Sequence, residues 1–220
     1  MFNGSIASAG EIYGILPSIP KNTTDSITAY GRLGDQVTPK SLKMSGSIAI
    51  VSAQYKRIRV RMFVLTAKAI KNAGQKSSID IVHLINDGQT DGGVQFDGTV
   101  QRRDFPVNTK TFTVLSDRSY DLCSASGTSV TGEPRMPDEG AVGAVPRFIN
   151  QDDNQKSFVH FNLDLPLPAK LNYAVASGND ATNYYPFMCI GYTEYDTNPA
   201  SSTSTEIAVS CSSMLRFDDS

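Results

Sequence analysis

The chain has 220 residues and a mass of 23.8 kDa, which is enough for one large domain or two small ones. Charged residues make up only 19% of it and apolar residues 40%, a composition that favours sheet-rich folds with extensive protein contacts. No apolar run approaches the roughly 18 residues of a membrane-spanning helix. Residues 1–10 lack the basic and apolar regions of a signal peptide.

Cysteine and histidine are too few and too scattered for most kinds of reactive site. Cys123, Cys189 and Cys211 are odd in number and widely spaced, which argues against a disulfide framework and a zinc site. We expect Cys189 and Cys211 to be buried thiols without a disulfide. His83 and His160 are the only histidines, so His-dependent nucleophilic catalysis has almost no material. We predict no catalytic site, no metal and no cofactor.

Charge is segregated along the chain although the net charge is only −2. Residues 32–76 contain ten basic residues and one acidic residue, whereas residues 152–220 contain nine acidic and three basic residues. Such segregation predicts a basic face on a nearly neutral molecule.

Short runs of β-branched and aromatic residues, separated by Gly, Pro, Asn, Asp and Ser, predict an almost entirely β-structured chain. Residues 116–119 have the composition of a turn, so the fourth and fifth strands are expected to form a hairpin. Residues 78–86 are expected to form a short helix inside a long loop. The eight expected strands are 5–16, 40–51, 57–66, 111–115, 120–123, 157–165, 185–195 and 205–217.

Three of these strands carry a period of two, which predicts one buried face for each. Apolar residues occupy even positions in 40–51 and 57–66, and odd positions in 157–165. These positions are expected to form the core. Phe63 and Leu65 make the third strand apolar on its second face as well.

Eight antiparallel strands in one domain suggest a sandwich or a jelly roll. The connections 17–39, 67–110, 124–156 and 166–184 are long, whereas 52–56 and 116–119 are short, and this alternation favours the jelly roll. We therefore predict a single all-β domain over residues 1–220. Lettering the strands B to I gives two four-stranded sheets, BIDG and CHEF, with long BC, DE, FG and GH loops.

Three stretches of the sequence resemble one protein family in their order and chemistry. They are YGRLGDQVTPKSLKMSG at 30–46 followed by KRIRVRMFV at 56–64; FPVNTKTFTVLSDR at 105–118; and LDLPLPAKLNY at 163–173 followed by YYPF at 184–187. Over residues 30–195 the chain resembles capsid proteins of the CRESS-DNA viruses, which have small circular single-stranded DNA genomes. Satellite viruses and other small RNA viruses use the same single jelly roll.

The resemblance implies a capsid protein that assembles into an icosahedral T=1 shell of 60 copies around single-stranded DNA. It further implies a location in the virion, assembly in the host nucleus, and a host-cell receptor as a partner. Such capsids usually begin with a basic arm, but residues 1–20 contain one acidic and no basic residue. This departure weakens the expectation of genome packaging and leaves that of shell formation unchanged. The alternatives are a glycan-binding, lectin-like module and the capsid protein of a small RNA or satellite virus.

The strongest candidate site is the stripe of Arg57, Arg59 and Arg61, which strand spacing places on one face opposite the apolar residues. With Lys56, these residues are expected to contact nucleic-acid phosphates without sequence preference. The assignment of 57–66 as strand D of the BIDG sheet, which commonly lines the interior in this family, supports that role. A salt-bridged strand face is the alternative interpretation. We expect Tyr184, Tyr185 and Tyr195 at subunit interfaces.

Overall fold

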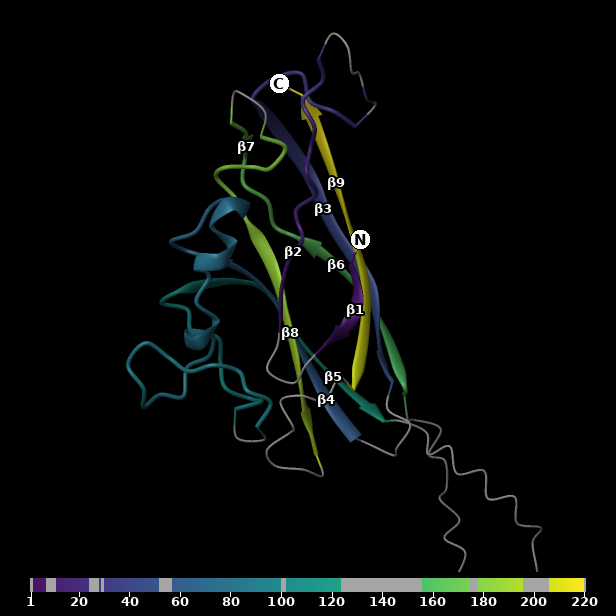
Figure 1. The fold of residues 1–220 in the computed structure, drawn as a ribbon, viewed down its shortest axis with the longest axis vertical. Helices are drawn as coiled ribbons and strands as arrows, with labels where there is room; N and C mark the ends of the chain where they lie inside the picture. The colour runs from purple at the N-terminus through teal and green to yellow at the C-terminus, as the bar shows by residue number, and fades with distance from the viewer. Residues whose placement is uncertain are drawn as a thin grey trace, which may run out of the picture.

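The computed structural model describes residues 2–6, 11–23, 28, 30–51, 57–99, 102–123, 156–174, 178–195 and 206–219. Almost all regular structure in these residues is β-strand (Figure 1). The elements are β1 (Phe2–Ile6), β2 (Glu11–Gly14), β3 (Gln36–Ile50), β4 (Arg57–Ala67), the 3-10 helices η1 (Ala73–Ser78) and η2 (Ile81–His83), β5 (Phe112–Cys123), β6 (Phe158–Leu165), β7 (Leu171–Asn172), β8 (Pro186–Glu194) and β9 (Ile207–Asp219).

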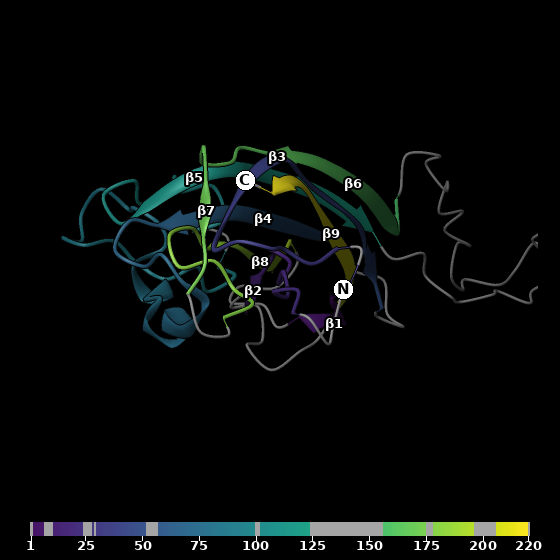
Figure 2. The ribbon, with the colours of Figure 1, turned by 90° about the horizontal axis from the view of Figure 1, so that it is seen from above.

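Two antiparallel sheets face each other (Figure 2). One has the strand order β1-β9-β3-β6, with the two-residue β7 paired to the start of β3, and the other has the order β2-β8-β4-β5. When the eight longer strands are lettered B to I along the chain, these orders become BIDG and CHEF. The predicted jelly roll is therefore confirmed.

Three of the expected strands were wrongly delimited. The expected strand 5–16 is two strands, because β1 pairs with β9 in one sheet and β2 pairs with β8 in the other. The sequence between them, residues 7–10, contains only small residues and carries no burial pattern that favours one continuous strand. The expected turn at 116–119 instead lies in the middle of β5, where every residue pairs with β4.

The first error counted two strands as one and the second counted one strand as two. The total therefore stays at eight, but the letters assigned to the strands between them change. Strand β4 is strand E of the CHEF sheet, so its assignment to the BIDG sheet was wrong. The long connections are CD (15–35), EF (68–111) and GH (166–185), whereas BC and DE are short. The prediction of long BC and DE loops was therefore wrong, that of a long GH loop is confirmed, and most of the FG connection lies outside the described residues. Two short 3-10 helices replace the helix expected at 78–86.

The main core lies between the two sheets and contains the residues that the period of two predicted. Alternate apolar residues of β3, β4 and β6 meet there, together with β8 and β9. The buried members from the three predicted strands are Leu42, Met44, Ile48, Ile58, Val60, Met62, Val64, Phe161, Leu163 and Leu165, with Ile50 and Val159 partly buried beside them.

A second core lies on the outer face of the CHEF sheet, where the EF connection folds back over it (Figure 1). Phe63 and Leu65 of β4 and Phe187 of β8 pack there against Phe96 and Leu84 of that connection. The rings of Phe63 and Phe96 meet in a T-shaped arrangement, with 6.0 Å between their centroids. This covering layer explains why β4 is apolar on both faces near its end.

A fully buried arginine ties the CD and GH connections together. The Arg32 guanidinium donates to the carbonyls of Gly34 and Gly178, and to Asp35 at 3.2 Å. It also lies 4.5 Å from the centroid of the Tyr173 ring. Both loops are therefore anchored to each other at one end of the sandwich.

The three cysteines are buried thiols that form no disulfide, which confirms the expectation for Cys189 and Cys211. These two lie on β8 and β9, in opposite sheets. Burial raises the pKa of the Cys189 thiol to about 12. Among the helices within the described ranges, none has the length and apolar character to cross a membrane.

Gly46 is the point at which β3 packs most tightly into the core, and its substitution offers a test of the fold. A Cβ atom there overlaps the Ser210 carbonyl oxygen and lies 2.7 Å from the Phe161 ring. We expect Gly46→Ala to lower the free energy of unfolding by about 1–3 kcal/mol, as overpacked cores do. Urea denaturation measures this, with the exposed neighbour Ser45→Ala as a control expected to be near neutral. Equal stability of the two variants contradicts the packing described for β3.

Candidate nucleic-acid interface

The three arginines of β4 point away from the main core, as strand alternation predicts, but their surroundings differ. Arg57 is exposed, Arg59 is partly buried with 27% of its side chain accessible, and Arg61 is buried with 8% accessible. Exposure falls along the strand because the EF connection covers the outer face from the Arg61 end. Lys56, the fourth residue of the predicted patch, lies outside the described residues.

Arg61 is held on every side by partners from its own chain. Its Nε and Nη2 atoms donate to the two carboxylate oxygens of Asp117 at 3.1 and 2.7 Å. Its Nη1 donates to the carbonyls of Arg103 and Phe105 at 2.7 and 2.6 Å, and the guanidinium lies 4.5 Å from the Phe63 ring centroid. Bidentate pairing with a carboxylate and burial of this kind are typical of a structural arginine. These partners and this burial argue against the predicted contact of Arg61 with phosphate.

Arg59 is paired with two carboxylates but stays partly accessible. It donates to both oxygens of Asp121 at 2.8 and 3.1 Å, and to Asp104 at 3.2 Å. Hydrogen bonding to Asp121 is the main cause that raises the pKa of Arg59. The same bond, with a smaller contribution from the Tyr195 hydroxyl, lowers the pKa of the Asp121 carboxyl against the opposing effect of its partial burial.

Tyr195, immediately after β8, gathers three guanidinium groups around its ring. The distances to the ring centroid are 5.0 Å for Arg103, 5.4 Å for Arg57 and 6.0 Å for Arg59. The phenol donates to Asp121 at 2.8 Å. Burial, and then this carboxylate, raise the pKa of Tyr195. These contacts fix the ring as the centre of a charged surface group.

We call this group the Tyr195 cluster. Its three arginines and two aspartates leave one net positive charge. Arg103 is itself paired with Asp104 at 2.9 Å, whereas Arg57 makes only the ring contact among the described residues. Among the described residues, the guanidinium of Arg57 and the Nη atoms of Arg103 have no hydrogen-bond partner, so these are the donors still available to an external anion. The members of the cluster are Arg57, Arg59, Arg103, Asp104, Asp121 and Tyr195.

The structure thus brings Arg57, Arg59 and Tyr195 together, whereas Tyr184 and Tyr185 make other contacts. Tyr185 is only 8% exposed and stacks on Phe187 in the second core, so it presents little surface to another subunit, which argues against the interface role expected for it. Tyr184 is partly buried, and its hydroxyl donates to the Pro166 carbonyl at 2.7 Å. Burial raises its pKa to about 12.

The acidic partners were missed by the sequence analysis although a signal for two of them exists. Asp117 and Asp121 lie four residues apart, so a continuous strand places both on one face. Asp121 is directly opposite Arg59, and Asp117 is opposite Phe63, diagonally across from Arg61. Because residues 116–119 were predicted to form a turn, Asp117 and Asp121 were not expected to lie on one strand. Arg103 and Asp104 come from the long EF connection, where no periodicity marks them.

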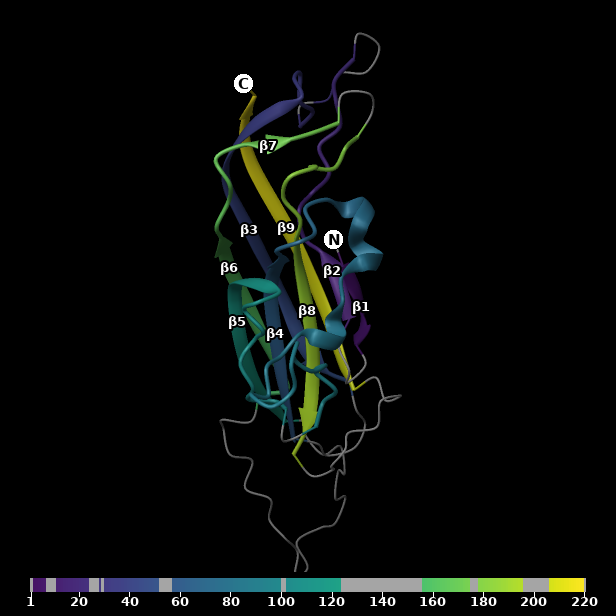
Figure 3. The same cartoon turned by 90° about the vertical axis from the view of Figure 1, so that its left-hand side faces the viewer.

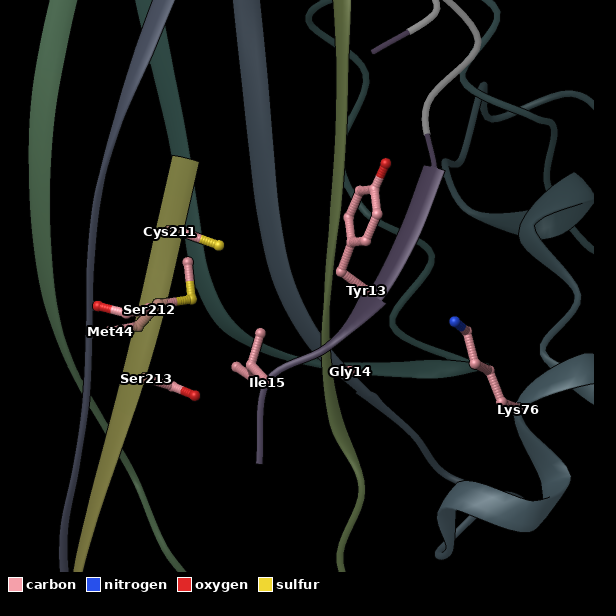
Figure 4. Close-up of a pocket in the computed structure, with 8 residues that line it drawn as sticks. All are labelled: Tyr13, Gly14, Ile15, Met44, Lys76, Cys211, Ser212 and Ser213. Atoms are coloured by element: carbon pink, nitrogen blue, oxygen red, sulfur yellow. The ribbon is translucent and has the colours of Figure 1, made fainter. Parts of the chain in front are cut away.

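Two hollows lie elsewhere on the molecule. One, of about 270 Å³, opens between the sheets beside β2 and β9 and is lined by apolar side chains, three polar ones and Lys76 of η1 (Figure 4). The other, of about 390 Å³, lies over β3, β6 and β9 and is lined mainly by Ser45, Ser47, Ser210 and Ser212 with His160. Within the described ranges, no three His, Cys, Asp or Glu side chains are grouped so as to hold a metal ion.

Comparison with known protein families found no matching family model. Comparison with curated proteins likewise found no match. The strand order places the chain in the class of eight-stranded jelly-roll domains.

The Arg61–Asp117 pair predicts a large stability difference within one stripe. Asp117→Ala leaves the buried Arg61 charge without its carboxylate, and we expect a loss of about 3 kcal/mol of unfolding free energy. Arg57→Ala removes an exposed side chain from the same strand face, with an expected change below about 0.5 kcal/mol. Urea denaturation of both variants measures the difference. Similar losses in both are inconsistent with a structural role confined to Arg61.

The lowered pKa of Asp121 predicts a pH-dependent contribution to stability. Since the folded-state pKa lies below the unfolded one, the contribution is present above the ordinary carboxyl pKa and disappears as pH falls through the folded value. Asp121→Asn is therefore expected to be less stable than the wild type at pH 7, with the difference shrinking below about pH 4. Denaturation at pH 7, 5 and 3 measures this. Asp91→Asn, an exposed site, is the control, and a gap that stays constant with pH contradicts the assignment.

Proposed function

We propose that this chain is the structural subunit of a closed viral shell, the capsid protein of a small single-stranded DNA virus. The observation that carries the proposal is the eight-stranded jelly roll with the BIDG and CHEF strand orders. It is joined by the three stretches that resemble CRESS-DNA capsid proteins. Since one fold serves many functions, the fold supports the proposal only together with those residues.

The resembling stretches follow one connected part of the fold. Residues 30–46 lead through the CD connection into β3, residues 56–64 cover most of β4, and residues 105–118 run into β5. Residues 163–173 cover the end of β6 and the first part of the GH connection, and residues 184–187 run from the end of that connection into β8. Three of these strands, β8, β4 and β5, are neighbours in one sheet, so the stretches are close in space as well as ordered in sequence.

The exposed apolar side chains suit a subunit with several neighbours. Tyr30 and Leu33 are 69% and 72% exposed, and they lie close together in the CD connection. Phe158 on β6 and Met214 on β9 are exposed on the BIDG sheet. A closed shell with cyclic contacts uses different patches of one subunit at different symmetry axes. Isolated exposed apolar residues are common, but the Tyr30–Leu33 pair in one loop favours a contact surface.

The proposed cargo is single-stranded DNA. The Arg-rich strand β4 lies in the CHEF sheet and not in the BIDG sheet, which commonly lines the interior in the family that the chain resembles. Within the Tyr195 cluster, Arg57 and Arg103 retain donors for phosphate, and the aromatic ring stacked with guanidinium groups suits unpaired bases. On the BIDG sheet, Lys40 and Lys43 are the exposed bases of β3.

One observation favours a second candidate, a glycan-binding module. The hollow over β3, β6 and β9 is rich in hydroxyl groups, and the exposed Phe158 ring packs edge-on against His160 at its side. Hydroxyl groups beside an aromatic ring are a common setting for sugars. A module of this kind is expected to remain a monomer or small oligomer.

Assembly of the purified chain tests the proposal. We expect it to form closed particles of about 60 copies and about 1.4 MDa, visible by negative-stain electron microscopy and sized by chromatography with light scattering. Salt and pH are varied because contacts between charged surfaces depend on both. A chain that stays monomeric under all these conditions and binds glycans on an array contradicts the shell and supports the second candidate.

The nucleic-acid content of the same particles tests the cargo. Arg57→Gln/Arg103→Gln removes two cations from the CHEF face, and Lys40→Gln/Lys43→Gln removes two from β3, so the pairs are matched in charge. Arg61 is left unchanged because its loss affects stability. We expect the first pair to lower the 260-to-280 nm absorbance ratio of intact particles. A decrease confined to the second pair assigns the cargo to the other sheet, and no decrease in either contradicts both surfaces.

A further inference from the structure

Strand β9 is much longer than one of its two neighbours. It pairs with β3 from Ile207 to Asp219, but β1 covers only Ile207–Cys211 on its other side. Figures 1 and 3 show β9 continuing beyond the start of β1. In the part of the chain that the structure describes, residues 212–219 therefore present one edge without a strand partner.

This edge is protected against strand addition by charge alone. Protected edges carry charged side chains, especially lysine, or carry proline or a bulge, or are very short. Residues 212–219 read SSMLRFDD, with three charged residues but neither lysine nor proline, and extend about 26 Å at roughly 3.3 Å per residue. The register shift in this part of the sheet lies on β3, between Pro39 and Ser41. The backbone of β9 therefore offers a regular template for another strand.

The space beside the edge is also open. Ser212 and Ser213 form one wall of the 270 Å³ hollow, and Tyr13, Gly14 and Ile15 of the opposite sheet form another (Figure 4). The hollow lies directly beyond the paired end of β1 at Cys211. The edge is thus accessible at the point where its pairing with β1 stops.

The charges on β9 indicate which strand fits there. Arg216 and Asp218 are both exposed and lie two residues apart, so they point to the same outer face. Arg216 has no acidic partner among the described residues. Asp218 pairs with Lys40 of β3 at 2.7 Å, in an exposed contact. A strand that placed an acidic residue beside Arg216 and a basic one beside Asp218 would complement both.

A second copy of β9, running antiparallel, meets that requirement in one register. Directly opposite residues share a face, so even-numbered residues oppose even-numbered ones. Alignment of Arg216 with itself opposes two cations, and alignment of Asp218 with itself opposes two anions. Alignment of Arg216 with Asp218 forms two attractive pairs related by the two-fold axis, which then passes through Phe217.

We propose that the β9 edge is a two-fold contact between two copies of this chain, with Arg216 of each copy opposite Asp218 of the other. Strand pairing across the axis joins the two BIDG sheets into one continuous sheet. The inference rests on the proposed function in so far as a shell needs two-fold contacts between copies. It names the strand, the register and the charged pairs that form this one.

Complementary charge reversal tests the contact. In a dimer of Arg216→Asp, the substituted residue of each copy faces Asp218 of the other, which gives two repulsive pairs of aspartates. In a dimer of Asp218→Arg, the substituted residue of each copy faces Arg216 of the other, which gives two repulsive pairs of arginines. We expect each variant to dimerise about 10- to 100-fold more weakly than the wild type, as measured by sedimentation equilibrium. An equimolar mixture of the two variants regains both attractive pairs and is expected to form heterodimers near wild-type affinity. A structural effect on the separate monomers does not produce such rescue.

Disulfide trapping tests the register independently. Arg216→Cys mixed with Asp218→Cys is expected to form an intermolecular disulfide on mild oxidation, whereas Arg216→Cys alone is not, because its two sulfurs lie diagonally across the strands. The three native thiols are buried, so the background is low. Both substituted residues are exposed, and circular dichroism checks that the variants remain folded.

The outcomes separate this contact from the proposed shell. Particles that form normally from both single-charge variants, without rescue or trapping, overturn the β9 contact and leave the shell standing. Wild-type dimers that show rescue and trapping but never form particles support the contact and contradict the shell. Trapping of Asp218→Cys with itself overturns the register, and a wild type that is monomeric throughout overturns both proposals.

Discussion

The packing of β3 on β4 between the two sheets holds this molecule together. Three apolar side chains of β3 and three of β4 meet there, and all are at most 1% exposed. At about 1.5–3 kcal/mol for each buried side chain, this layer contributes on the order of 10 kcal/mol, comparable with the net stability of a whole domain. They are Leu42, Met44, Ile48, Ile58, Val60 and Met62. Because β6 and β9 pair with β3, and β5 and β8 pair with β4, this contact positions the later long strands of both sheets.

The second face of β4 explains the character of the candidate site. Phe63 and Leu65 hold the EF connection against that face, and Arg61 on the same side is covered with them. A covered guanidinium requires a carboxylate and backbone acceptors, which Asp117 and the EF carbonyls supply. The charge that remains free is therefore displaced toward Arg57 and Tyr195, at the uncovered end of the strand. Along one arginine stripe, Arg61 is thus built into the fold whereas Arg57 stays accessible.

Period-two burial was sufficient to predict the core, since one-residue slips expose a whole strand face. Strand boundaries were harder because local composition competed with tertiary partners. Residues 116–119 look like a turn, yet Asp117 in their midst pairs with Arg61 of the next strand. Merging β1 and β2 lost one strand and splitting β5 added one, so the strand count stayed at eight while the lettering shifted. That shift alone moved the arginine stripe to the wrong sheet.

The sequence by itself determined the all-β class, the jelly-roll architecture, the inner faces of β3, β4 and β6, and the alternation of arginines with apolar residues on β4. The jelly-roll architecture was inferred from the lengths of the connections, and the other features depend on residue type and periodicity within a strand, which neighbouring residues specify. Only the tertiary structure decided that Arg61 is buried, that Tyr195 gathers Arg57, Arg59 and Arg103, and that β9 extends beyond β1. These features depend on which distant segment covers or pairs with a strand. Contacts between distant segments leave no periodic trace in the residues that make them.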